Sequence, residues 1–392
     1  MISVEEAKNL VLTNIQQQEK KRVAINSALN YFLAEDVLAP ICVPLFNQSA
    51  MDGYAFKFED VHQQLNIVDT IPAGDVRIVE VKKGEAVRIF TGSKVPDSCD
   101  TVVMQELTTV NRNLLTVKDE GLKFGGNVRK KGNQIKEGDV ALKKGTRINA
   151  AAIGFLTTLG FTHVEVFDLP KITVIATGSE LVELGRPLNE GQIYESNTHM
   201  LNAGIQQIGI TPIIHVVKDD VAATEKLIQE ALINADFLIL SGGISVGDYD
   251  FVKESLLKNG VEEIFYKIKQ KPGKPLFFGK KGEKAIFALP GNPAAALNCF
   301  YMYVLPAINL AMGSLTPFLP IVKLPLADKY IKKEGRAQFL KAQFNPNGVS
   351  LMLGQDSDAL QSFALANGLV YIAAEKVTVE QNELVDVYLL PN

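Results

Sequence analysis

An apolar run at residues 237–240 is followed at once by a glycine-rich turn at 241–250 and a helical pattern at 251–258. A run without polar alternation is typical of a strand buried on both faces of a parallel sheet. Glycines allow the backbone to approach an anion closely, and the free N–H groups that begin a helix face it. Asp248 and Asp250 in this turn could hold a metal ion or cap the helix, and the turn alone favours neither. The combination predicts an α/β protein with an anion site at a strand end.

From residue 170 onward, expected strands and helices alternate along the chain. Such alternation predicts a mainly parallel sheet with helices on both faces and ligands at the carboxyl ends of its strands. The expected strands lie at 172–175, 212–217, 237–240, 263–268, 276–278 and 285–288, and the expected helices at 197–209, 220–232 and 251–258.

The rest of the chain has a different pattern, and 392 residues are enough for several domains. Residues 1–34 are expected to be helical, a second helical pattern covers about 150–159, and short β-like runs fill the stretch between them and the stretch beyond 318. We therefore predict an α/β multidomain protein with a helical N-terminal and linking domain (1–42 plus 137–168), a β-rich insertion (43–136), an α/β domain (169–317) and a C-terminal β-barrel-like domain (318–392).

Composition narrows the class of protein. A net charge of −4 argues against a general nucleic-acid binder, and three scattered cysteines exclude a disulfide framework or zinc knuckle and suit a reducing compartment. The acidic, polar start predicts no signal peptide. The uncharged stretch at 285–322 is interrupted by prolines, so we expect a buried helix at about 293–312, at a domain or subunit interface, and no membrane span. A cytoplasmic location follows from these expectations.

Two further expected strands also end in acidic turns. Glu180 follows the strand at 172–175, and Asp219 and Asp220 follow the strand at 212–217. One of the two aspartates is expected to cap the next helix, whereas glutamate is not a favoured N-cap. Because parallel strands end at one edge of a sheet, these carboxylates should gather near the glycine turn.

Lysines are concentrated at 267–275. Strand alternation sends Lys267, Lys269 and Lys271 to one face, and Lys274 follows in a Pro-Gly-Lys-Pro turn. Like charges so close repel each other unless an anion neutralises them, although lysines on a solvated edge strand would also fit. The rigid turn favours a phosphate or oxyanion site.

A strand-to-helix turn at 289–295 has Asn292 at the expected N-cap and Pro293 at the first helical position. The uncharged helix that follows favours an anion at this end, and a purely structural turn fits equally well. Together the glycine turn, the lysines and this turn predict a pocket for a large polyanionic ligand.

Three short motifs lie in the β-rich insertion. Asp52 lies in a loop of small residues, Thr91 lies in a tight turn, and Arg129 begins a basic segment. None of them indicates a function alone.

Five motifs occur in one fixed order: SAMDGYA, TGSE, SGGISVGDYD, KPGKP and LPGNP. Together they closely resemble the molybdopterin molybdenumtransferase family, which includes MoeA and the gephyrin E domain, over essentially the whole chain. The resemblance implies binding of adenylylated molybdopterin, insertion of molybdate, and release of AMP, assisted by Mg²⁺. It also implies a homodimer of four-domain subunits, with the pathway's adenylyltransferase as a further partner and no nucleic-acid or membrane partner.

The resemblance also implies roles for individual residues. Asp250 and Glu180 are expected to bind the metal and take part in catalysis, together with Asp52 and Lys271. In the dimer, Asp52 and Thr91 of one chain would face Glu180, Asp219 and Asp250 of the other. The expected substrate-binding residues are Thr91, Arg129, Asp219, Gly242, Gly243, Ser245, Lys267, Lys274, Pro290, Pro293 and, in the last domain, Ser357.

One position departs from the family pattern, because Gln134 stands where an acidic residue is usual. This keeps open a catalytically weakened paralogue that acts as a molybdopterin-binding dimeric scaffold. A molybdopterin adenylyltransferase shares the α/β domain but needs neither the insertion nor the C-terminal domain. A nucleotide-dependent dehydrogenase is disfavoured, because no GxGxxG opens a βαβ unit.

Overall fold

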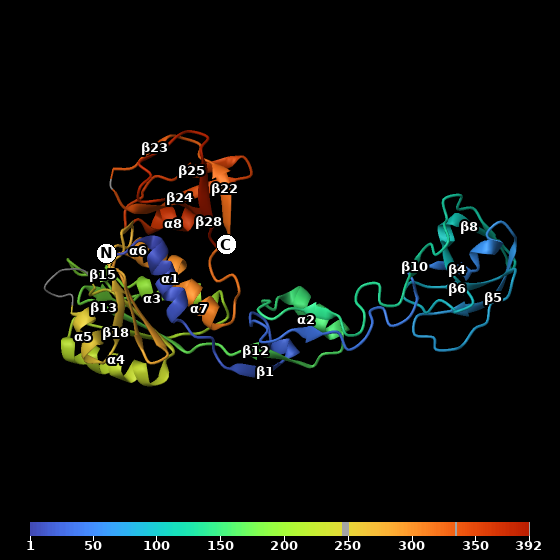
Figure 1. Cartoon of the computed structure of the whole chain (residues 1–392), viewed down its shortest axis with the longest axis horizontal. Helices are drawn as coiled ribbons and strands as arrows, with labels where there is room; N and C mark the ends of the chain where they lie inside the picture. Colours follow the sequence, from blue (N-terminus) through green and yellow to red (C-terminus); the bar gives the residue numbers. More distant parts are fainter. Residues whose placement is uncertain (245–250, 334, 392) are drawn as a thin grey trace. The chain divides into compact units, whose positions relative to one another are not determined.

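The computed structural model describes residues 1–244, 251–333 and 335–391 (Figure 1). The chain forms two compact units. The first consists of Met1–Ala34, Gly145–Asn149 and Val164–Asn392, and the second of Glu35–Lys144 and Ala150–His163. The four-domain division stays a prediction.

The first unit contains a six-stranded sheet in the order β16-β13-β17-β21-β20-β18. The first four strands are parallel and the last two antiparallel, so the mainly parallel sheet is confirmed. The strands are β13 (Ile172–Thr177), β16 (Ile213–Val217), β17 (Phe237–Ser241), β18 (Glu262–Tyr266), β20 (Phe277–Lys281) and β21 (Lys284–Leu289). The helices are α1 (Val4–Asn14), α3 (Asn197–Gln206), α4 (Val221–Asn234), α5 (Val252–Lys258), α6 (Pro293–Cys299) and α7 (Leu305–Ala311).

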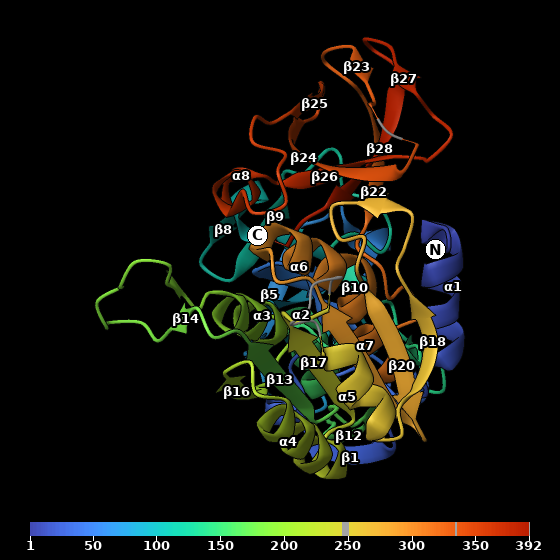
Figure 2. The same ribbon diagram turned by 90° about the vertical axis from the view of Figure 1, so that its left-hand side faces the viewer.

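Both faces of this sheet are buried, which explains why its strands lack polar alternation (Figure 2). On one face Ile175 and Leu240 pack with residues of α4 and α5, and on the other Val174 and Ile239 pack with residues of α1, α3, α6 and α7. Burial of each such side chain contributes about 1.5–3 kcal/mol. Adjacent residues of one strand thus belong to different cores, and the strand is held from both sides.

The apolar helix predicted at 293–312 is continuous. It runs from α6 through a π-helical segment, η4 (Phe300–Val304), into α7. The helix is long and apolar enough to cross a membrane, but 83% of the 18-residue window is buried inside the protein. It is packed as a core helix, with Phe300 and Tyr303 fully buried.

The N-terminal segment differs from the prediction of helix through residue 34. Helix α1 begins after Ser3, whose hydroxyl accepts a hydrogen bond from Glu6 N at 3.0 Å, and buries Val4, Ala7 and Val11. It ends at Asn14, and β1 (Lys20–Ala24) pairs with β12 (His163–Phe167). The expectation failed because a strand ladder, a long-range interaction, replaces the local helical preference.

Strands beyond the long helix, together with β19 from before it, form a second sheet of the first unit in the order β19-β24-β26-β28-β22, with β25 paired to β24. This agrees with the predicted C-terminal β-domain. The elements are β19 (Gln270–Lys271), β22 (Ile321–Pro325), β23 (Tyr330–Ile331), β24 (Ala337–Asn345), β25 (Gly348–Leu351), α8 (Leu360–Leu365), β26 (Gly368–Ile372), β27 (Thr378–Val379) and β28 (Leu384–Leu389). Two short strands, β14 (Leu181–Val182) and β15 (Ile193–Tyr194), pair with each other in the segment that connects β13 to α3.

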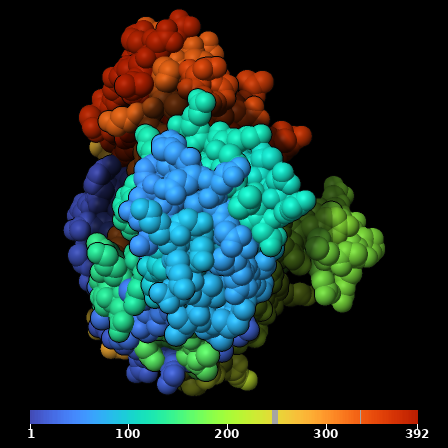
Figure 3. Space-filling view, turned by 90° about the vertical axis from the view of Figure 1, so that its right-hand side faces the viewer, coloured from blue at the N-terminus to red at the C-terminus, as the bar shows by residue number. Residues whose placement is uncertain are grey.

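The second unit is β-rich, as its residues predict, and its surface is shown in light blue to green in Figure 3. Its main sheet has the order β7-β4-β6-β5-β9-β8. Its elements are β2 (Val37–Leu38), β3 (Gln48–Ser49), β4 (Gly53–Phe56), β5 (Leu65–Ile71), β6 (Glu85–Ile89), β7 (Thr101–Met104), β8 (Thr108–Asn111), β9 (Leu114–Val117), β10 (Val128–Arg129), β11 (Val140–Leu142) and α2 (Ala150–Thr158).

Candidate active site

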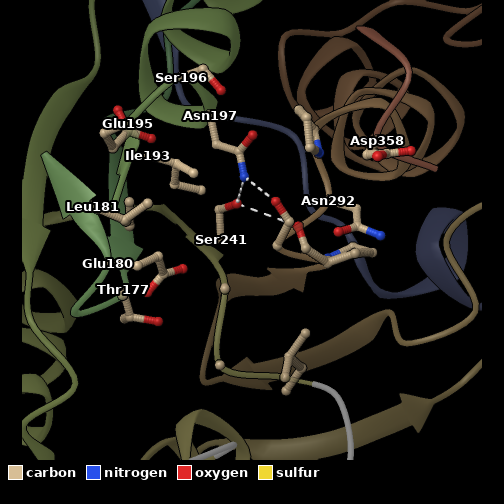
Figure 4. A pocket seen from close by; sticks show the side chains of 18 of the residues that line it. Thr177, Glu180, Leu181, Ile193, Glu195, Ser196, Asn197, Ser241, Asn292 and Asp358 are labelled. Atoms are coloured by element: carbon tan, nitrogen blue, oxygen red, sulfur yellow. Dashed lines mark hydrogen bonds between the residues drawn. The ribbon is translucent and has the colours of Figure 1, made fainter. Parts of the chain in front are cut away.

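The carboxyl ends of β13, β17 and β21 open into a cavity of about 780 Å³ (Figure 4). The register places Ala176 beside Ser241 and Ser241 beside Leu289, so the three loops that follow start at the same level. Volumes of this size suit a small-molecule site. The loop after β16, the start of α3 and one loop of the C-terminal segment complete the lining.

The glycine turn after β17 requires both of its glycines. Gly242 and Gly243 have φ of 97° and 60°, in the left-handed region. A Cβ on Gly242 would lie 2.4 Å from the carbonyl oxygen of Thr177, and one on Gly243 would lie 2.7 Å from Val252 Cγ2. The turn therefore lies against β13 and α5 in a way that only glycine permits, as the sequence predicted.

The acidic turns meet on the rim of the cavity. Glu180 and Asp219 both line it. The Asp219 carboxylate accepts from Ser179 N at 2.8 Å, and Ser179 Oγ accepts from Asp219 N at 3.1 Å, so the turns after β13 and β16 are locked together. Asp220 caps α4 by accepting from Ala223 N at 2.7 Å, which confirms that one aspartate has the structural role. The Glu180 carboxylate is exposed and makes no hydrogen bond with any residue that the structure describes.

Asn197, at the start of α3, connects the turns after β17 and β21 at the cavity. Its Nδ2 donates to Ser241 Oγ at 2.8 Å and to Gly291 O at 2.7 Å (Figure 4). Its Oδ1 and the Thr177 Oγ1 are buried and have no hydrogen-bond partner among the described residues. Buried polar atoms are normally paired, so a ligand or water is expected to satisfy them. Sequence reasoning missed Asn197, because a lone asparagine at a helix start resembles an ordinary cap.

The turn after β21 brings Pro290 and Pro293 to the cavity. Asn292 is the N-cap residue of α6, as predicted, but its side chain donates to Ser357 Oγ at 2.7 Å instead of capping the helix. Ala295 N also donates to Ser357 O at 3.0 Å. These contacts fix Ser357 beside the site and place Asp358, which the sequence did not single out, in the lining.

Comparisons with known proteins match this architecture. Residues 2–160 match the MoeA N-terminal region (domain I and II), residues 173–310 a probable molybdopterin binding domain, and residues 323–390 the MoeA C-terminal region (domain IV). The molybdopterin molybdenumtransferases of Staphylococcus epidermidis and Haemophilus influenzae are 32% and 34% identical to this chain. Each alignment covers 99% of this chain, and 95% and 98% of the respective relative. The chain belongs to the molybdopterin molybdenumtransferase family.

Solved structures agree with this membership. Two crystal structures of a molybdopterin biosynthesis MoeA protein from Pyrococcus horikoshii superpose with TM-scores of 0.84 and 0.80, at 27% and 30% sequence identity. In both, all of this chain and all of the other are covered.

The lysines that the family resemblance assigns to anion binding follow β18 in the chain. Lys267, Lys271 and Lys274 are absent from the described lining of the cavity. The expected strand alternation is wrong: β18 ends at Tyr266, Lys267 has φ of 71°, and Lys271 belongs to β19 of the second sheet. A residue in the left-handed region breaks the period of two on which the expectation rested. The role of these lysines in holding anions stays a prediction.

In the second unit, the structure brings together two of the three short motifs of the insertion. Asp52 Oδ1 accepts from Thr91 N at 2.7 Å and from Thr91 Oγ1 at 2.8 Å. These hydrogen bonds to the charged form lower the pKa of Asp52. Arg129 is exposed on β10, which pairs with β3 just before the Asp52 loop. Gln134, at the usually acidic family position, is also exposed.

Two predicted site residues, Ser245 and Asp250, lie outside the described residues, as does Asp248. Their family-derived roles stay predictions.

Proposed function

We propose that this chain catalyses the insertion of molybdate into adenylylated molybdopterin with release of AMP, the last step of molybdenum cofactor biosynthesis. One observation carries the proposal: the glycine turn, Glu180, Asp219 and the Pro290–Pro293 turn line one cavity, in a chain aligned over 99% of its length with molybdenumtransferases. We further propose a cytoplasmic location.

The charges of the lining decide how a polyanion would be held. The described lining contains Glu180, Glu195, Asp219 and Asp358 and no lysine, arginine or histidine. Glu195 is buried and satisfied by Thr198, whose N donates to it at 2.8 Å. A phosphoanhydride therefore needs positive charge from another source, or the carboxylates would repel it.

Magnesium fits this donor set. It binds through one or two carboxylates plus substrate phosphates, without a dedicated protein cage. Among the described residues there is no cluster of three or more metal-ligating side chains, while Glu180 has an exposed carboxylate free for a cation. Glu180 would hold the ion, with Asp219 fixed nearby by Ser179 and Asp250 as the proposed further ligand. When bound, magnesium would neutralise phosphate charge and make the anhydride easier to cleave.

The neutral part of the site would position the substrate. At Gly242 and Gly243 the backbone can approach phosphates closely, and Pro290 and Pro293 would shape the molybdate end. The Ser357 oxygen already accepts from Asn292, so its own proton is available to an acceptor of the ligand.

The second unit would contribute through a homodimer. We propose that Asp52 and Thr91 of one chain face the cavity of its partner, with the Asp52–Thr91 hydrogen bonds already formed. Asp52 would then present an ionised carboxylate at neutral pH. The adenylyltransferase of the pathway is the proposed donor of the adenylylated substrate.

The test is to incubate purified protein anaerobically with adenylylated molybdopterin and Mg²⁺, with and without molybdate, and to measure AMP and active cofactor. Molybdate-dependent release of AMP is expected. Binding of the substrate without release would support the scaffold that Gln134 suggests. In a separate incubation with ATP and molybdopterin, release of pyrophosphate would support an adenylyltransferase instead.

A further inference from the structure

The loop at 352–359 reaches the cavity from the C-terminal segment and presents Asp358 to it. We propose that Asp358 is a ligand-binding residue whose carboxylate accepts a pair of hydrogen bonds from adjacent neutral N–H or O–H donors of the ligand. The inference rests on the proposed function and assigns the recognition of an uncharged part of the substrate to this residue.

The loop is held rigidly by a buried lysine. Lys341 is 3% exposed, and its Nζ donates to the carbonyl oxygens of Asp356 and Ala359, both at 3.1 Å. These two carbonyls lie on either side of residues 357 and 358. A buried ammonium is costly unless it is hydrogen-bonded, so the lysine and the loop conformation depend on each other.

The side chains of one glutamine and one serine also support the loop. Gln355 accepts from Lys341 N at 3.0 Å and donates to Lys341 O and Met352 O, each at 2.8 Å. Ser362 Oγ lies 2.6 Å from Gly354 O and 2.9 Å from Ala359 O. On the cavity side, Ser357 is held by Asn292 and Ala295. The backbone on either side of Asp358 is therefore fixed before a ligand arrives, as the neighbours of binding residues are.

The Asp358 carboxylate itself is exposed and makes no hydrogen bond with any described residue. Figure 4 places it across the cavity from Glu180, with Asn197 and Ser241 between them. Because the described lining has no cationic side chain, a phosphate beside Asp358 would be repelled. The part of the ligand that contacts Asp358 must instead carry donors.

A carboxylate is well suited to two adjacent donors, since it accepts in bidentate fashion. Adenylylated molybdopterin has two such pairs: the amino and ring N–H groups of the pterin, and the two ribose hydroxyls of the adenylyl group. Asp358 offers an exposed pair of acceptor oxygens to either of them.

The test is calorimetric titration of the full-length protein under anaerobic conditions with molybdopterin and with AMP, each with and without Mg²⁺. Asp358→Asn keeps the size and loses the charge and one acceptor. Asp356→Asn is the matched control, because it removes a carboxylate from the same loop that does not line the cavity. Loss of a charge-assisted bidentate contact should weaken binding about tenfold to a hundredfold.

If Asp358→Asn weakens the binding of molybdopterin alone, Asp358 contacts the pterin edge; if it weakens the binding of AMP alone, Asp358 contacts the ribose hydroxyls. Either result supports the proposal, provided that the affinities of Asp356→Asn stay within about twofold of wild type. The unaffected probe reports that the variant is folded. Unchanged or tighter binding of both probes, equal weakening of both, or an effect that requires Mg²⁺ would overturn it. If wild-type protein binds neither probe, the proposed function fails as well, which separates that failure from the failure of Asp358 alone.

Discussion

Replacing Gly242 by alanine tests whether the glycine turn has the close approach that the structure gives it. The matched control is Gly185→Ala in the same unit. Both glycines have positive φ, 97° and 86°, but a Cβ on Gly185 would meet nothing within 4 Å. The left-handed cost of about 1–2 kcal/mol is therefore shared, and the difference between the variants isolates the contact with Thr177.

The size of that difference follows from the geometry. A Cβ at 2.4 Å from the Thr177 carbonyl oxygen must move by roughly 1 Å to reach ordinary van der Waals contact. Thr177 ends a strand buried between two other strands, so its backbone cannot easily yield. Overpacking of this kind costs about 1–3 kcal/mol. We expect Gly242→Ala to be destabilised by about 2–5 kcal/mol in total, against about 1–2 kcal/mol for Gly185→Ala.

The measurement is hydrogen–deuterium exchange by mass spectrometry on peptides covering β13 and β17, because a chain with two compact units is not expected to unfold in one step. Protection of these strands should fall further in Gly242→Ala than in Gly185→Ala, by the difference expected between the two variants. AMP affinity should fall at least about tenfold in the first variant, since the turn has to move. Equal protection in the two variants would refute the close approach.

Three other changes have expected outcomes. Burial lowers the pKa of Lys8 from 10.5 to about 8, so between these pH values the unfolded chain binds more protons than the folded one, and the free energy of unfolding of the first unit should rise with pH by up to about 3 kcal/mol. Urea titrations of Lys8→Met at several pH values should show no such rise. A lower stability of this variant than of wild type at pH 7 would show that the attraction between the ammonium and the surrounding aromatic rings outweighs the cost of burial. Lys341→Met should raise KM for the adenylylated substrate about tenfold with kcat little changed. The control is Lys332→Met, which removes an equally buried lysine whose ammonium donates to the Ala373 and Ala374 carbonyls, and which should lower stability without changing KM. The same KM in both variants would contradict a role of Lys341 in holding the loop. Thr91→Val removes one of two donors to Asp52 and should move its pKa up toward the usual range in an NMR titration, and an unchanged pKa would show that the backbone N–H suffices.

Local sequence patterns were enough to predict features that depend on a single helix or strand. The buried strand at 237–240, a helix cap by one of Asp219 and Asp220, and the N-cap position of Asn292 were predictable, because burial on both faces and helix-start chemistry leave marks within a few residues. The gathering of Glu180 and Asp219 on one rim was also predictable, because parallel strands end at one edge.

Long-range contacts were not predictable in this way. Asn197 meets Gly291 across 94 positions and Asn292 meets Ser357 across 65, and no spacing in the sequence records either pair. The second of these contacts places Asp358, the neighbour of Ser357, in the lining of the cavity. Lys267 was misplaced because its left-handed backbone interrupts the strand alternation, and the end of α1 at Asn14 was missed because β1 finds its partner in β12.

The role of Glu180 in the active site is tested by comparing molybdate-dependent AMP release by wild-type protein, Glu180→Gln and Glu183→Gln. Glu183 lies three residues away and forms an exposed ion pair with Arg186, so its loss should matter little. We expect normal release by Glu183→Gln and a loss of at least about tenfold to a hundredfold in Glu180→Gln, with partial recovery at high Mg²⁺. Full release by Glu180→Gln would contradict the assignment of this cavity as the active site.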